Sequence, residues 1–315
     1  IWMVFVTEFL FTLALPAQYY SADDAAQHFE DFIKKFEKHY IDNEEKTARF
    51  EIFKSNLEKI NRSNNASSHA IFGITQFSDQ TREEFLHRFA GLRTDEPPQL
   101  TYCGNVVNDG NVPDANAPES FDWRSRNVVS PVKNQGQCGS CYAFSTIAHL
   151  ESQYAMKYGQ IIDLSEQQIV DCSTLTYGCG GGFMSDAMLE LKRLGGSMSE
   201  ADYPYEETSG SCQSDPNKAA VKISSCSSYS LTSQEKLKQL LYQVGPVAIG
   251  KSTNYLNHAV LLVGYGIENG MPYWLLKNSW GTTFGEEGFF KLERSDNPSG
   301  ACGMLNDMMA TGVVQ

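Results

Sequence analysis

Glycine is distributed unevenly along this 315-residue chain, and the change divides it into two parts. Residues 18–116 contain 4 glycines, 11 Lys or Arg and 17 Asp or Glu, whereas residues 117–315 contain 21 glycines. Charged stretches with few glycines favour helices, and frequent glycines favour the turns that connect strands. We therefore expect a charged helical segment followed by a larger α+β domain, with the boundary near residue 116.

The first 17 residues are apolar except for Glu8 and end in small residues. This pattern is typical of a secretory signal peptide, with a membrane anchor as the alternative. Residue 1 is not Met, so the natural chain can extend further. No later segment approaches the roughly 20 apolar residues of a membrane span. We expect a soluble mature protein in an oxidising compartment, without nucleic-acid or anionic-membrane partners, because its net charge is -13.

Apolar side chains in the first part recur at helical spacing and predict two helices. The first face is Phe29, Phe32, Ile33, Phe36 and Tyr40, and the second is Phe50, Phe53, Leu57 and Ile60. Thr81 and Glu84 fit a capping box that would begin a third helix. The stretch between Thr94 and Pro118 is rich in Pro, Asn and Asp and predicts an exposed, cleavable linker.

The second part predicts helices before strands. Residues 142–158 form a helical pattern that Gly159 would end. Four strands are expected after residue 245, over residues 247–249, 259–263, 273–276 and 288–292. A helical lobe followed by a sheet lobe leaves a cleft between them, where a site is usually found.

Two cysteines, Cys138 and Cys141, lie directly before the expected helix. Backbone N–H groups at a helix start stabilise a thiolate, so Cys141 is a candidate nucleophile. A redox pair, half of a zinc site and two structural cysteines are the alternatives. Zinc would require a second ligand pair, which the chain does not offer at the usual spacing. A redox pair would favour a smaller, compact fold.

A nucleophilic cysteine needs a base, usually histidine. Only His149 and His258 follow residue 116. His149 lies eight residues along the same helix from Cys141, about 12 Å away, and cannot reach the sulfur. This leaves His258, which opens an apolar strand. A lone strand histidine is more often a core residue, but the cysteine motif favours the catalytic interpretation.

Several motifs resemble those of the papain-like cysteine peptidases. Residues 138–142, Cys-Gly-Ser-Cys-Tyr, fit a signature of that family. The interspersed propeptide motif is matched at Glu45, Arg49, Phe53, Asn56, Ile60 and Asn64. Residues 73–79 resemble a second propeptide motif, with Thr75 where the family has Asn, and residues 121–124 resemble the start of the mature enzyme.

The resemblance implies a zymogen with a signal peptide at 1–17, an inhibitory helical propeptide at 18–116 and a peptidase domain at 117–315, cleaved near Asn116 or Ala117. It implies a papain-like two-lobe α+β fold, with a helical left lobe, a β-barrel-like right lobe and a cleft between them. Cys141 would attack the peptide carbonyl, and His258 would carry the proton as an imidazolium beside the thiolate. Asn278 would orient the imidazole, and Gln135 would donate to the oxyanion.

The same resemblance implies a substrate groove. Its residues would be Gly181, Gly182, Phe183, Met184, Ala259, Trp280 and Asp307. Trp280 would shield the Asn278–His258 bond, and Asp307 would admit basic side chains into the specificity pocket. Plainer interpretations are a turn for Asn278, core packing for Trp280, a disulfide-tied loop for the glycines and a solvated surface position for Asp307.

Four cysteines are implied to pair as Cys138–Cys179 and Cys172–Cys212. Cys226 and Cys302 either pair with each other or stay free, because the family's partner cysteine before the catalytic His is missing here. We expect a monomeric cysteine endopeptidase of a lysosome or extracellular space, without cofactor or metal, that acts on peptides and proteins and is inhibited by its own propeptide.

One departure argues against full activity. Cys141 and His258 are 117 residues apart, fewer than the roughly 130–150 expected. The gap lies at residues 250–257, where a five-residue hairpin loop would have to replace a longer connection. The alternative function is therefore a catalytically impaired relative that keeps the fold for binding.

Overall fold

The computed structural model describes residues 19–67, 70–89, 91, 103, 106–253, 256–294, 305 and 309–315. The expected signal peptide at 1–17, Asp307 and Cys302 therefore lie outside the described residues. The chain divides into two compact units between Gln80 and Thr81, and each is described separately. This structural division lies 36 residues before the maturation boundary expected at residue 116.

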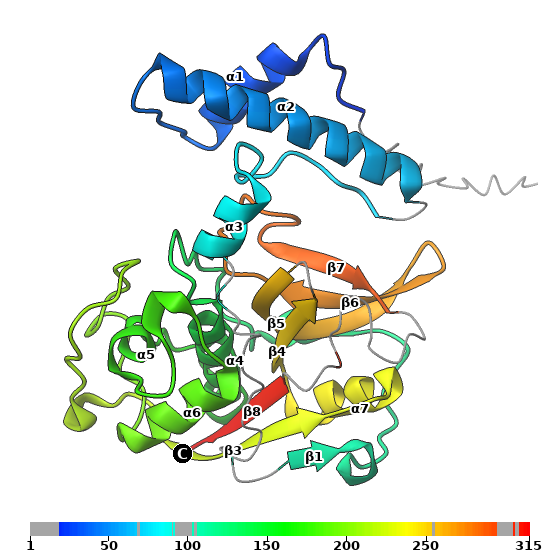
Figure 1. Ribbon diagram of the computed structural model, residues 1–315. Helices are drawn as coiled ribbons and strands as arrows, with labels where there is room; N and C mark the ends of the chain where they lie inside the picture. The colour runs from blue at the N-terminus through cyan, green and yellow to red at the C-terminus, as the bar shows by residue number, and fades with distance from the viewer. Residues whose placement is uncertain are drawn as a thin grey trace, which may run out of the picture. The chain divides into compact units, whose positions relative to one another are not determined.

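The N-terminal unit is a pair of helices, α1 (Ala25–Lys35) and α2 (Asn43–Ala66), shown in blue in Figure 1. Their apolar faces enclose a core that includes Phe29, Phe32 and Phe53, which confirms the two predicted helical faces. The propeptide motif residues of α2 hold the following chain by its backbone. Asn56 donates to the carbonyl oxygens of Ser78 and Gln80, at 3.0 and 2.9 Å.

The second unit begins with α3 (Arg82–Phe89). The predicted capping box is present: the Thr81 N–H donates to a Glu84 carboxylate oxygen at 2.8 Å, and the Glu84 N–H donates to the Thr81 hydroxyl at 3.2 Å. Two of the backbone N–H groups at the helix start are satisfied in this way.

A helical lobe follows, and the long helix α4 (Cys141–Tyr158) crosses its centre. Gly159 ends the helix at φ +75°, in the left-handed region, as predicted. The other helices of this lobe are α5 (Gln167–Cys172) and α6 (Met184–Arg193). Short 3-10 turns occupy Asp109–Asn111, Trp123–Arg126, Gly178–Gly180 and Pro216–Lys218.

The sheet lobe contains one eight-stranded sheet and helix α7 (Gln234–Val244). Its strands are β1 (Val106–Asn108), β2 (Phe121–Asp122), β3 (Ile223–Ser230), β4 (Val247–Thr253), β5 (Leu256–Glu268), β6 (Met271–Lys277), β7 (Phe289–Glu293) and β8 (Met309–Val314). The order is β1-β3-β8-β4-β5-β6-β7, and β2 pairs with β5. All four predicted strands are confirmed, whereas β1, β2, β3, β8 and α7 were not predicted.

Two expectations need correction. Among the described strands, β1 and β7 end the hydrogen-bonded path, so the sheet is open rather than barrel-like. Part of the expected linker is also built into the sheet lobe. Strand β1 pairs in parallel with β3, and Val112 is only 3% exposed among the side chains around α7. Most side chains of residues 106–114 are exposed, as predicted for a linker, but strand pairing at β1 and the burial of Val112 hold this segment on the sheet lobe.

His149 joins three elements inside the second unit. One ring nitrogen lies 2.7 Å from the Pro246 carbonyl oxygen before β4, and the other accepts the Gly312 N–H of β8 at 2.7 Å. Burial lowers the pKa of this histidine. A neutral ring that donates once and accepts once satisfies both contacts, so His149 has a structural role, consistent with its exclusion as a catalytic base.

Candidate active site

Cys141 is the first residue of α4, and its side chain is fully buried. The loop before it is fixed by the Cys138–Cys179 disulfide and by a 3.0 Å hydrogen bond from the Gly139 N–H to the Cys179 carbonyl oxygen. The disulfide and the helix start together determine where the sulfur points. No other cysteine among the described residues is outside a disulfide.

The thiol form of Cys141 is favoured in this state. Burial raises its pKa to about 11, although hydrogen bonds from the backbone of Ala259 and Gly91 act in the opposite direction. We expected the helix start to stabilise a thiolate. Desolvation outweighs that field here because the sulfur has no access to water.

His258 lies on β5, one residue before Ala259, whose backbone approaches the Cys141 sulfur. The His258 Nε2 lies 2.7 Å from the Asn278 Oδ1. The same oxygen accepts a hydrogen bond from the Ser279 backbone N–H at 2.8 Å. The imidazole stacks on Trp280 with a centroid distance of 4.4 Å, and Phe284 packs edge-on against the indole. Asn278 therefore contacts the histidine as well as its own turn, and Trp280 covers that contact.

Gln135 is fully buried beside the cysteine loop. The Gln135 Oε1 accepts a hydrogen bond from the Ser279 hydroxyl at 2.7 Å, and the Gln135 backbone N–H donates to the Ser279 carbonyl oxygen at 2.9 Å. These bonds leave the Nε2 group to donate on the side of the cysteine loop, where it contacts the Cys138 carbonyl oxygen at 2.9 Å. Ser279 is thus a positioning residue that the sequence analysis did not identify.

An upstream segment, α3 and Gly91, lies on these residues. The Phe89 carbonyl oxygen accepts from Gln135 Nε2 at 3.2 Å, and the Gly91 carbonyl oxygen accepts the Gly182 N–H at 2.9 Å. Phe85 packs edge-on against Trp280 at 5.5 Å. The chain's own backbone therefore accepts hydrogen bonds from Gln135 Nε2 and from the glycine-rich loop at Gly182. The sequence carries no local signal for these contacts, because they depend on the tertiary placement of Phe89 and Gly91.

The glycine-rich loop pairs closely with this segment because it has no side chains. Gly181 has φ +105°, and a Cβ there would lie 2.4 Å from the Gly91 carbonyl oxygen. A Cβ on Gly182 would lie 2.7 Å from Thr176. Phe183 and Met184 are 8% and 2% exposed and belong to the helical-lobe core, so neither side chain is open to solvent in this state.

The expected disulfides Cys138–Cys179 and Cys172–Cys212 are present. The sequence analysis left Cys226 paired with Cys302 or free, and neither alternative holds, because Cys226 is bonded to Cys103. An odd number of cysteines remained after two bridges and one nucleophile, namely Cys103, Cys226 and Cys302. That parity was the signal that could have drawn attention to Cys103.

Comparison with known proteins agrees with this geometry. Residues 117–255 and 249–312 match the papain family cysteine protease profile, and residues 29–85 match the cathepsin propeptide inhibitor domain. The chain belongs to the papain family. The first match is in two pieces that meet at the β4–β5 connection, which is where the sequence departs from the expected spacing.

Viral cathepsins are among the papain-family relatives. The protein of Heliothis zea nuclear polyhedrosis virus is 42% identical over 329 residues, covering 96% of this chain and 89% of its own. That of Spodoptera litura multicapsid nucleopolyhedrovirus is 44% identical over 321 residues, covering 94% and 93%. Since the first alignment is longer than the 315 residues of this chain, the relative has residues that this chain lacks.

Solved papain-family zymogens have the same fold. Digestive procathepsin L2 from the Tenebrio molitor larval midgut has a TM-score of 0.84 at 35% identity, covering 91% of this chain and 99% of its own. Recombinant stem bromelain precursor has a TM-score of 0.80 at 31% identity, covering 92% and 99%. This papain-family chain is therefore a cysteine peptidase zymogen that carries its own inhibitory propeptide.

A buried ionic cluster lies beneath the papain-family site, between α4 and β6. Lys133 Nζ contacts carboxylate oxygens of Glu151 and Glu166, each at 3.0 Å and each carboxylate 1% exposed. Burial raises the pKa of Glu166 to about 8 and lowers that of Lys277, the neighbour of Asn278, to about 8. The cluster therefore holds a proton near neutral pH.

The described residues contain no group of His, Cys, Asp or Glu side chains that could hold a metal ion. In the same part of the chain, no helix is both long and apolar enough to cross a bilayer.

Proposed function

We propose that Cys141, His258, Asn278 and Gln135 carry out peptide-bond hydrolysis once the upstream segment has left. The Cys141 sulfur attacks the carbonyl carbon, and the oxyanion receives hydrogen bonds from Gln135 Nε2 and from the Cys141 N–H. His258 gives its proton to the leaving amine, and then takes one from the water that hydrolyses the acyl-enzyme. Asn278 keeps the ring in place, and Trp280 keeps water from the Asn278–His258 bond.

The observation that carries this proposal is the peptide carbonyl already bound at the oxyanion donor. The Phe89 carbonyl oxygen accepts a hydrogen bond from Gln135 Nε2 at 3.2 Å, as a substrate carbonyl would. The glycine loop binds a second carbonyl of the same segment, that of Gly91. Two backbone contacts two residues apart indicate a groove that recognises extended peptide by its main chain, which favours endopeptidase action on proteins.

We further propose that the propeptide comprises residues 18–116 and that maturation cleaves near Asn116 or Ala117. The papain-family match beginning at residue 117 supports this boundary. A working place in the secretory pathway, in a lysosome or an extracellular lumen, fits three disulfides and a propeptide that delays activity. Asp307 remains our candidate for the floor of the specificity pocket.

The test is hydrolysis of a fluorogenic peptide by the acid-processed protein, combined with labelling by a thiol-directed epoxide peptide. Cys141→Ala should abolish both signals. Asn278→Ala and Gln135→Ala should keep the label but lower kcat by roughly 10–1000-fold, the range for lost positioning and oxyanion contacts. Asp307→Ala should lower the preference for Arg over Leu at the pocket position. Full activity in Cys141→Ala would overturn the assignment.

A further inference from the structure

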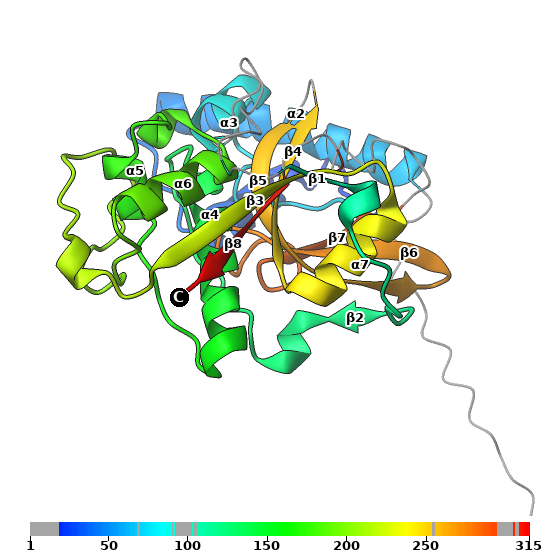
Figure 2. The same cartoon turned by 90° about the horizontal axis from the view of Figure 1, so that it is seen from below.

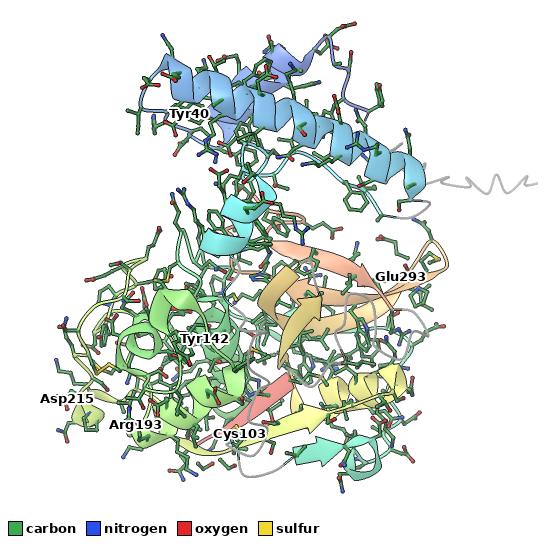
Figure 3. The ribbon with its side chains drawn as sticks, in the orientation of Figure 1. Tyr40, Cys103, Tyr142, Arg193, Asp215 and Glu293 are labelled. Carbon is green, nitrogen blue, oxygen red and sulfur yellow. A yellow bond between two sulfur atoms is a disulfide. The ribbon has the colours of Figure 1, made fainter. Side chains whose placement is uncertain are left out.

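A disulfide crosses the proposed maturation boundary. Cys103 lies 13 residues before Asn116, in the proposed propeptide, whereas Cys226 lies on β3 of the peptidase body. Cys103 is 7% exposed and Cys226 is 4% exposed. Figure 3 labels Cys103 close to the β3–β8 pair. A cut at Asn116 breaks the chain between Cys103 and Cys226. The disulfide then still joins the two pieces.

Residues 106–114, which lie between Cys103 and the cut, also contact the peptidase body independently of the disulfide. Figure 2 shows β1 beside β3, and the register pairs Val106, Val107 and Asn108 with Ser228, Tyr229 and Ser230. The pairing covers one edge of β3, which would otherwise present unpaired backbone groups.

Helix α7 holds the continuation of this segment. Lys236 Nζ donates to the Val112 carbonyl oxygen at 2.9 Å and contacts the Asp114 carboxylate at 2.8 Å. Gln243 Nε2 donates to the Pro113 carbonyl oxygen at 2.8 Å. The Val112 side chain is buried against the sheet-lobe core. Cys103 and residues 106–114 are therefore attached to the peptidase body by a covalent bond, by strand pairing and by the burial of Val112.

We propose that residues 103–116 remain in the mature enzyme as a short second chain held by Cys103–Cys226, and that activation takes two cuts. The proposal rests on the cut near residue 116 proposed above. The first hydrolysis adds one water at that bond and releases nothing. The second hydrolysis, on the N-terminal side of Cys103, adds another water and frees the inhibitory part of the propeptide.

The once-cut molecule stays inhibited because the tether is short. Only 11 residues separate Gly91 from Cys103. A segment held by a linker of this length has an effective concentration on the order of millimolar at its site. If the inhibitory contact has a dissociation constant near one micromolar, this effective concentration exceeds it about 1000-fold. The contact would then remain almost fully occupied after the first cut.

The disulfide can be tested without any processing. Non-reducing peptide mapping of the intact Cys141→Ala zymogen should link the peptide that contains Cys103 to the one that contains Cys226. A Cys226–Cys302 link, or free thiols at Cys103 and Cys226, would overturn the proposal whatever becomes of the peptidase function.

The retained chain is then tested on acid-processed wild-type protein whose free thiols have been alkylated first. Intact mass without reductant should show one species, which reductant splits into a body beginning near residue 117 and a peptide containing Cys103. A mass that reductant does not split would contradict retention. If no cut occurs near residue 116, the boundary proposed for maturation fails instead, and the mapping result still stands.

The order of the two cuts is tested with the variant Cys103→Ser. Gly110→Ala is the control variant in the same segment, because a Cβ on Gly110 meets nothing within 4 Å. In wild type and Gly110→Ala, peptidase activity should lag behind the first cut. In Cys103→Ser the lag should disappear, and iodoacetamide should label Cys226. An unchanged lag in Cys103→Ser, with Cys226 labelled, would show that the disulfide does not delay activation.

Discussion

Gly91 is the residue at which the upstream segment comes closest to the catalytic loop. A Cβ there would lie 1.6 Å from the Gly139 carbonyl oxygen. Gly91→Ala should therefore push the segment off the site at a cost of about 1–3 kcal/mol, the usual penalty for overpacking. We expect the zymogen to show higher activity at neutral pH, by roughly tenfold or more. A fluorogenic peptide assay on uncut zymogen measures this change.

Gly110→Ala is the control for this prediction, because it makes the same change in open space and should leave the zymogen as inactive as wild type. After maturation, Gly91→Ala and wild type should have equal kcat/KM, since residue 91 has left with the propeptide. Equal basal activity of the two uncut zymogens would mean that the contact at Gly139 does not hold the segment in place.

Glu166 makes the stability of the peptidase body depend on pH. Burial raises its pKa to about 8, so the folded body binds a proton more tightly than the unfolded chain does. Its contribution to stability is fully present below about pH 4.3, the ordinary value for Glu, and is lost as pH rises through about 8. Melting temperatures of Cys141→Ala zymogen should fall across this window. The slope from one proton is at most about 1.4 kcal/mol per pH unit.

Glu166→Gln, in the same Cys141→Ala background, should flatten that part of the profile, because the amide cannot titrate while its oxygen can still accept from Lys133 Nζ. Asp186 offers a matched comparison, because burial raises its pKa to about 7 in a different part of the helical lobe. Asp186→Asn should flatten only the range below about pH 7. A Glu166→Gln profile parallel to that of wild type would contradict the role of the Glu166 proton.

The residues proposed as catalytic could be selected from the sequence, whereas the backbone groups that contact them could not. The cysteine motif and the scarcity of histidines selected Cys141 and His258, and resemblance added Asn278 and Gln135. Nothing local to Phe89 or Gly91 says that their carbonyl groups meet Gln135 and Gly182, since that contact depends on tertiary placement. In this state burial also raises the pKa of Cys141, and burial cannot be predicted from a helix start alone.

Among the elements, the β4–β5 hairpin shows how the shortened region is accommodated. The two strands pair from Val247 and Leu262 to Thr253 and Leu256, so the expected five-residue loop is replaced by continued strand pairing. His258 still reaches Asn278 at 2.7 Å. We expect the shortened connection to cover less of the neighbouring surface, and a less covered face is less stable.

We expect the melting temperature of the mature enzyme to lie a few degrees below that of a relative with the longer connection, such as the viral cathepsin of Heliothis zea nuclear polyhedrosis virus. A loss of about 1–2 kcal/mol of packing free energy corresponds to a shift of this size. Turnover and discrimination between substrates should also be lower. Calorimetry and a peptide library measure these differences. A mature form from the source tissue heavier by about twenty residues, the length suggested by the usual spacing, would instead show that the natural hairpin is longer.

Strand prediction depended on composition. Strands β4 to β7 are rich in Val, Leu, Tyr and Phe and were found, but β3 has the sequence Ile-Ser-Ser-Cys-Ser-Ser-Tyr-Ser. Serine-rich segments favour loops. Pairing with β8 and with β1 makes it a strand, and these partners are distant in the chain. Tertiary pairing therefore overrides a weak local preference.

For the whole molecule, acid should loosen the N-terminal unit, whereas the proton bound by Glu166 favours the folded peptidase body. In the N-terminal unit, the buried Asp79 carboxylate accepts from Lys38 Nζ at 3.1 Å and from the Tyr40 hydroxyl at 3.0 Å. Folded units that depend on paired carboxylates generally lose stability in acid. We expect the propeptide, residues 18–116, to inhibit at neutral pH and to be processed at acid pH. Mass measured over time at pH 7 and pH 4.5 follows this process.

Asp79→Asn removes the ion pair with Lys38 and should speed processing at pH 7. Asp23→Asn, whose side chain lies on an exposed turn, should not. Equal processing of the wild-type zymogen at both pH values would rule out acid as the trigger.

The Gly312 amide bound to His149 offers a reporter of a single buried proton. When the imidazole nitrogen is protonated it can no longer accept that N–H, so the amide loses its partner while its strand neighbours keep theirs. Because burial lowers the pKa of His149, this loss begins below the ordinary histidine value, about 6.5, and marks the acid limit of this one contact. Hydrogen–deuterium exchange at that one amide would display the limit directly, without label, chromophore or substrate.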